Sequence, residues 1–127
     1  MLAILANGTR IKAFGSGQKM RGVIHKHTRP TLIILDDVES EKNSKTIESR
    51  VDLRKWVSEA VLPTLTPDGK AIMIGTVIAE DCMIKLLQQS ESWKTLEYAI
   101  VDHNGKASWE DRYNLQWIEQ KKLDVLS

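Results

Sequence analysis

The sequence of 127 residues contains a single cysteine, Cys82. One cysteine excludes an internal disulfide and a cysteine-rich zinc site, so Cys82 is most simply a small apolar side chain of the core. No apolar run approaches the roughly 20 residues that a membrane-spanning helix needs. Residues 1–6 are too few for the apolar part of a signal peptide. We therefore expect a cytoplasmic protein with no membrane partner.

Neither sign of charge dominates, since 18 lysines and arginines face 17 acids and the formal net charge is +1. This balance gives no overall attraction to nucleic acid. The charge is nevertheless unevenly spread, because residues 18–29 hold four basic residues and two histidines but no acid, and several acids follow directly. A solvated loop of mixed charge and a surface for nucleic-acid phosphates are both open interpretations of this stretch.

The first half of the chain predicts strands. Two extended runs, residues 1–5 and 10–14, flank Asn7-Gly8 and predict a β-hairpin, because both turn residues tolerate positive φ. Residues 31–35 lack polar alternation, as expected of a strand that is covered on both faces. Residues 70–74 form a second apolar run that follows a Pro-Asp-Gly turn and predict another buried strand.

Helical patterns lie between and after these strands. One helix is predicted from a capping pair, Ser49 and Asp52, to Pro63, with an apolar stripe at Leu53, Trp56, Val57, Ala60 and Val61. Residues 80–89 predict a second helix, residues 93–101 an extended segment and residues 102–105 a turn. Ser108 and Asp111 repeat the capping spacing before a last helix, whose aromatic residues are most simply core: Trp109, Tyr113 and Trp117.

This order of elements predicts an α/β fold in which a mainly parallel sheet carries flanking helices behind an N-terminal hairpin. Residues 1–127 are expected to form a single domain. Right-handed crossovers place the carboxyl ends of parallel strands at one edge of the sheet, which is where α/β proteins bind ligands.

Both apolar strands end in residues that could serve chemistry. Asp36, Asp37 and Glu39 follow the first strand, and Gly75-Thr76 follows the second. Acids at the end of a buried strand either cap the next element or hold a cation. An apolar strand that ends in adjacent acids is also the layout of a Walker B element, in which one acid holds the magnesium shell and a neighbour orients water.

The succession of motifs along the chain closely resembles the large subunit of tailed-phage terminases, the motor that packages double-stranded DNA into a procapsid. The resemblance covers nearly the whole chain and depends on the order of the motifs. They are Gly8-Thr9, Gly15-Ser16-Gly17, Arg21-Gly22, Arg29-Pro30, LIILDDVES, Leu62-Pro63, Pro67-Asp68-Gly69, AIMIGT, Glu80-Asp81 and Trp109-Glu110-Asp111-Arg112-Tyr113.

The resemblance implies part of a RecA-like ATPase domain of the P-loop NTPase class, acting with ATP and Mg²⁺. Asp36 then matches the magnesium-binding position, and either Asp37 or Glu39 the residue that activates water. Gly75 and Thr76 match a coupling motif that senses the γ-phosphate, and Arg21 an arginine that reaches a neighbouring subunit's nucleotide. The implied partners are double-stranded DNA, other terminase subunits and the portal, in the cytoplasm of a host cell.

Several departures from the family pattern limit what this chain can do. It contains no G-x-x-x-x-G-K-[ST] motif to cradle phosphates, and Val77-Ile78-Ala79 stands where similar members often carry Arg-Trp-His. Family members also carry a carboxyl-terminal nuclease domain, which we expect this fragment to lack. We therefore expect a fragment of the ATPase domain that does not hydrolyse ATP unaided and that associates with itself or with a complementary N-terminal fragment.

Other interpretations stay open. The chain could be a non-catalytic nucleic-acid-binding or assembly module, a prophage remnant, in which residues 18–29 bind phosphates and the acids are structural. His25 and His27 could bind a divalent metal with an aspartate, because alternate residues of an extended segment share a face. Nucleophilic catalysis has no support, since His103 lies in a predicted turn and no G-x-S-x-G motif is present.

Overall fold

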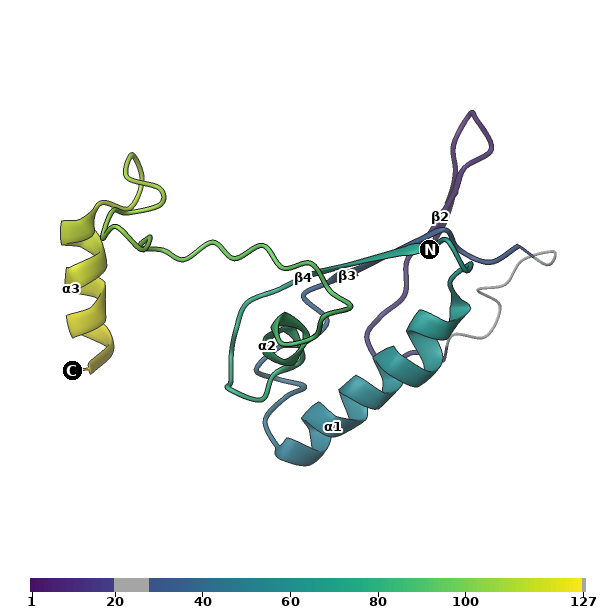
Figure 1. The fold of residues 1–127 in the computed structure, drawn as a ribbon, viewed down its shortest axis with the longest axis horizontal. Coiled ribbons are helices and arrows are strands. Elements are labelled where there is room, and N and C mark those ends of the chain that lie inside the picture. Colours follow the sequence, from purple (N-terminus) through teal and green to yellow (C-terminus); the bar gives the residue numbers. More distant parts are fainter. Residues whose placement is uncertain (20–27, 127) are drawn as a thin grey trace. The chain divides into compact units, whose positions relative to one another are not determined.

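The computed structural model describes residues 1–19 and 28–126, and it divides the chain into two compact units, Met1–Trp93 and a second that begins at Lys94 (Figure 1). The first unit is a small α/β fold. Its elements, in order, are β1 Leu2–Ile4, β2 Arg10–Lys12, β3 Leu32–Asp36, α1 Ile47–Lys55, the π-helix η1 Trp56–Val61, the 3-10 helix η2 Leu62–Thr64, β4 Lys70–Ile74 and α2 Met83–Gln88. The second unit carries α3 Leu115–Leu126.

The predicted N-terminal hairpin is confirmed, with β1 and β2 antiparallel. Its turn differs from the expected one, because Gly8 has a φ of 82° whereas Asn7 keeps a negative φ. The Gly8 amide donates to the Leu5 carbonyl at 2.9 Å, and the Leu5 amide donates to the Thr9 carbonyl at 2.8 Å. These bonds define a longer loop that closes with a glycine bulge, so positive φ is needed at the glycine alone.

The two predicted apolar strands are confirmed as the parallel pair β3–β4. The prediction that residues 31–35 are covered on both faces is wrong. Leu35 is 4% exposed, whereas its neighbour Ile34 is 57% exposed, so burial alternates along the strand. An apolar run indicates that a strand favours burial on both faces. In the described part of the first unit, however, helices cover only one face of the β3–β4 pair.

The helix after β3 begins earlier than the spacing of Ser49 and Asp52 predicts. Thr46 is the N-cap, and its hydroxyl accepts from the Ser49 amide at 3.1 Å while the Ser49 hydroxyl accepts from the Thr46 amide at 3.1 Å. Ser49 is therefore the third helical residue and the reciprocal member of a capping box, a role that Glu or Gln usually fills. The helical run continues through η1 and η2, where Pro63 lies in the last turn.

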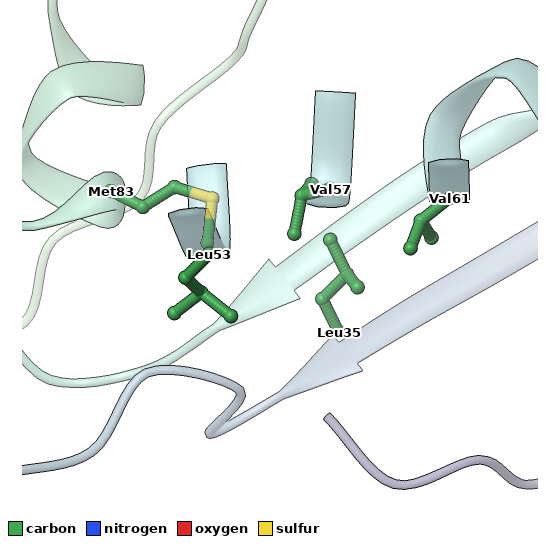
Figure 2. Packing of buried hydrophobic residues seen from close by; sticks show 5 residues of the cluster. All are labelled: Leu35, Leu53, Val57, Val61 and Met83. Atoms are coloured by element: carbon green, nitrogen blue, oxygen red, sulfur yellow. The ribbon is translucent and has the colours of Figure 1, made fainter. Parts of the chain in front are cut away.

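The predicted apolar stripe forms the core of the first unit, which Figure 2 shows at close range. Its buried members come from β3, α1, η1 and α2: Leu35, Leu53, Val57, Val61 and Met83. Trp56 is partly buried against this cluster. The helices thus pack on the inner face of β3–β4 and hold both strand ends in place.

In the second unit, the predicted turn at residues 102–105 is confirmed, with Gly105 at a φ of 76° and a bridge between Val101 and Ala107. The last helix starts later than predicted. Ser108 donates its hydroxyl to the Ala99 carbonyl instead of capping, and Asn114 accepts from the Trp117 amide at 2.9 Å at the start of α3. An amide side chain outside the expected spacing thus sets this helix boundary.

The three aromatic residues predicted as core touch one another but are not buried together. The Trp109 and Tyr113 rings lie 6.0 Å apart edge to face, and the Tyr113 and Trp117 rings lie 4.5 Å apart. Trp109 is 58% exposed and Trp117 is 41% exposed. Their helical spacing did not lead to burial because residues 108–113 form turns and only Trp117 lies in α3.

Within residues 1–19 and 28–126, no helix combines the length and apolarity needed to cross a membrane.

Candidate functional site

The carboxyl ends of β3 and β4 meet at one edge of the first unit. Asp36 is in register with Ile74, and the Asp37 amide extends the ladder by donating to the Ile74 carbonyl at 3.0 Å. The chain therefore leaves the sheet through Asp36-Asp37 on one strand and through Gly75-Thr76 on its neighbour. The structure brings these four predicted site residues together, as parallel pairing requires.

Asp37 has an unusual backbone conformation for this position. Its φ is 44°, which lies in the left-handed region that residues other than Gly, Asn and Asp rarely adopt. This conformation turns the chain sharply after β3 and aims the carboxylate toward β4, where a Cβ placed on Gly75 would lie 3.9 Å from Asp37 Oδ1. Asp37, Gly75 and Thr76 line a small hollow together with Glu39 and Ile84.

Glu39 turns inward instead of joining the exposed aspartates. Its side chain is 9% exposed, and its Oε2 accepts a 2.6 Å hydrogen bond from the Met83 amide at the start of α2. Its Oε1 is buried and has no hydrogen-bond partner among the residues that the structure describes. Glu39 therefore fastens the loop after β3 to α2, and α2 begins at Met83, not at Glu80 as predicted.

The two neighbouring aspartates, by contrast, are both exposed at the strand ends, as is Thr76. The acids of LIILDDVES thus divide: Glu39 accepts from the Met83 amide at the start of α2, and the two aspartates remain accessible. Carboxylate and hydroxyl oxygens suit a hard cation such as Mg²⁺, which keeps several waters and takes one or two carboxylates together with substrate phosphates. Asp36 and Asp37 are accessible and carry oxygen atoms of the kind that such an ion takes as ligands.

The described residues provide neither a dedicated metal-binding cluster nor a complete ATP site. No group of three or more His, Cys, Asp or Glu side chains that could hold a metal ion occurs among the described residues. ATP does not fit the residues of this chain, because the sequence contains no glycine-rich loop of the P-loop type to cradle its phosphates. A nucleotide would need a phosphate-binding segment from another polypeptide.

The basic stretch from 18 to 29 is described only at its ends. Arg21, proposed to reach a neighbouring nucleotide, and His25 and His27, proposed as metal ligands, lie outside the described residues. Arg29 serves the fold, since its guanidinium donates to the Pro63 carbonyl at 2.7 Å. Gln18 likewise serves the fold, because its carbonyl accepts from the Trp56 indole at 3.0 Å.

A polar clamp that the sequence did not reveal holds the segment between β4 and α2. Arg50 Nε lies 2.9 Å from Asp81 Oδ1 and 3.0 Å from Oδ2, and Arg54 donates to the Asp81 carbonyl at 2.8 Å. Arg50 also donates to the Ser44 carbonyl at 2.8 Å. The clamp fixes the end of the segment that begins at Gly75-Thr76, and no sequence spacing links residues so far apart in the chain.

We expect this clamp to make stability depend on pH. The hydrogen bond from Arg50 is the main cause that lowers the pKa of Asp81 below its ordinary value of 3.8. A carboxyl whose pKa is lower in the folded state stabilises the fold fully above the unfolded pKa and ceases to do so as pH falls through the folded value. Asp81→Asn should therefore destabilise the first unit at neutral pH, and the deficit should shrink as pH falls below 3.8 and vanish below the lowered pKa of Asp81.

Urea unfolding followed by circular dichroism between neutral and acidic pH measures this difference. Asp68→Asn is the matched control, because Asp68 is an exposed turn residue. It should change the free energy of unfolding at neutral pH by no more than about 0.5 kcal/mol. A deficit for Asp81→Asn that stays constant through the acid range would show that the ion pair does not stabilise the fold.

Comparison of this chain with protein-family models, with curated proteins and with solved structures finds no match.

Proposed function

We propose that this chain is part of the ATPase motor of a tailed-phage terminase large subunit, which couples ATP hydrolysis to the packaging of double-stranded DNA. The supporting observation is the register of β3 and β4, which sets Asp36 and Asp37 beside Gly75 and Thr76 at one edge. This is the arrangement that a Walker B strand and its coupling segment need in a RecA-like domain. Double-stranded DNA, other terminase subunits and the portal are the partners of this proposal.

The exposed and buried acids suggest a division of roles within this site. Asp36 would hold the water shell of magnesium, whose charge offsets that of transferring phosphates. Asp37 is better placed than Glu39 to orient a water molecule, because Glu39 is engaged with the Met83 amide and Asp37 faces Gly75. Thr76 lines the same small hollow as Asp37. Glu39 would position α2 and act on the chemistry indirectly.

The proposal is tested by complementation. The chain is mixed with a co-encoded polypeptide that bears a G-x-x-x-x-G-K-[ST] motif, and ATP turnover is measured with Mg²⁺. We expect turnover in the mixture and in neither component alone, with a loss of about 100-fold or more for Asp36→Ala, because the variant removes a ligand of the metal that stabilises the transition state. Asp68 is an exposed aspartate that is distant in sequence from Asp36, and Asp68→Ala should leave turnover unchanged.

The cation site can also be tested on the chain by itself. Mn²⁺, a paramagnetic substitute for Mg²⁺, should broaden the backbone amide signals of residues 36, 37 and 76 in an NMR spectrum, and excess Mg²⁺ should reverse the broadening.

In the complementation experiment, ATP turnover that survives Asp36→Ala would refute the role assigned to Asp36.

A further inference from the structure

The outer face of the β3–β4 pair is an apolar surface that the described part of the first unit leaves uncovered. Four of its side chains are about half exposed: Leu32 at 49%, Ile34 at 57%, Ile72 at 46% and Ile74 at 53%. The parallel register places them side by side, with Ile34 opposite Ile72. Parallel strands are normally buried on both faces, so an exposed apolar face of this kind indicates an interaction surface.

Opposite charges stand at the two ends of this apolar face. Lys70 pairs in register with Leu32 at the amino end, and Asp36 pairs with Ile74 at the carboxyl end. Both side chains are exposed, and neither takes part in an ion pair with another described residue. The face is therefore apolar in the middle, basic at one end and acidic at the other.

We propose that a second copy of this chain covers the outer face of β3–β4, and that the two copies form a symmetric dimer. A two-fold axis perpendicular to the strands, lying between the two sheets, sets the strands of the two copies antiparallel. Lys70 of each copy then lies opposite Asp36 of the partner subunit, and the four apolar side chains of one copy meet those of the other. A patch whose charges are opposite at its two ends complements itself under this symmetry.

Sheets that pack face to face lie about 10 Å apart, a gap that one side chain from each copy fills and that a lysine can span to reach a carboxylate. The interface is small, so we expect a weak dimer with a dissociation constant on the order of 10–100 µM. This inference does not depend on the proposed function. It does imply that the dimer and a cation compete for Asp36, because one carboxylate cannot serve both fully.

Sedimentation velocity over concentrations on both sides of the expected dissociation constant tests the dimer. The unaltered chain should pass from monomer to dimer, and Ile34→Asp should raise the dissociation constant about tenfold or more by placing a charge in the apolar patch. Ile47→Asp is the matched control, since Ile47 is 68% exposed on α1 and lies away from this face. A monomer at every concentration, or a dimer unaffected by Ile34→Asp, would overturn the proposal.

Charge reversal tests the geometry of the dimer. Asp36→Lys and Lys70→Asp should each weaken self-association, because each variant alone opposes like charges across the two-fold axis. An equimolar mixture of the two variants should form a heterodimer about as tight as the original dimer, since both contacts are then between opposite charges. Both positions are exposed, so circular dichroism should show intact folding. A mixture that stays monomeric would refute the antiparallel arrangement.

Discussion

Val57→Asp should unfold the first unit. Val57 lies on η1, is 3% exposed and belongs to the core cluster that the helices form with β3, so an aspartate there would be buried without a partner. Burying an unpaired charge costs several kcal/mol, and a unit of this size has only about 5–10 kcal/mol of stability to lose. We expect the far-UV circular dichroism of the first unit to lose its cooperative thermal transition.

The neighbouring residue gives the control for this experiment. Ser58 lies on the same π-helix but is exposed, and Ser58→Asp should change the free energy of unfolding by no more than about 0.5 kcal/mol. Val57→Ala should fall between the two, because it removes apolar contacts without adding a charge. If Val57→Asp melts like the unaltered chain, the helices do not pack on β3 as described.

Glu39→Ala should destabilise the first unit by about 2 kcal/mol, within the range of about 1–3 kcal/mol for a buried donor that loses its partner. The substitution leaves the Met83 amide buried without an acceptor, and it removes the side chain that ties the loop after β3 to α2. The loss is limited because Glu39 Oε1 is itself buried without a described partner, and this unfavourable burial also ends. Urea unfolding measures the change.

Glu39→Gln separates the hydrogen bond from the charge. The amide oxygen of glutamine can accept from Met83 as the carboxylate does, so we expect this variant to stay within about 1 kcal/mol of the unaltered chain. Glu41→Ala, an exposed acid in the same loop, should have almost no effect. Equal losses for Glu39→Ala and Glu39→Gln would show that the charge of Glu39 matters, not its bond to Met83.

These two experiments also bear on the proposed site. The core cluster and Glu39 together position the segments that follow β3 and β4. Val57→Asp and Glu39→Ala should therefore both disturb the edge where Asp37 faces Gly75. Glu39→Ala can do so without touching either exposed aspartate. A loss of Mn²⁺ broadening in a folded Glu39→Ala variant, restored in Glu39→Gln, would identify Glu39 as a positioning residue for the cation site.

Local signals in the sequence predicted the elements well where the determining residues are close together. The hairpin follows from Asn7-Gly8, and the two strands follow from apolar runs between turn residues. Helix boundaries were less accurate because several residues in each case could cap. Thr46 and Asn114 took the capping positions that the spacing assigned to Ser49 and Ser108, and the outcome depended on which side chain had an unpaired amide within reach.

The sequence by itself determined that β3 and β4 are apolar strands and that Asp36, Asp37, Gly75 and Thr76 follow them, because side-chain type and short spacing encode these features. Only the tertiary structure decided that Glu39 turns inward to Met83, that Arg50 clamps Asp81, and that one face of the strand pair stays open. Each of these depends on contacts between segments distant in the chain. An acid after a strand caps a helix or stays exposed according to what folds against it, and no local pattern carries that information.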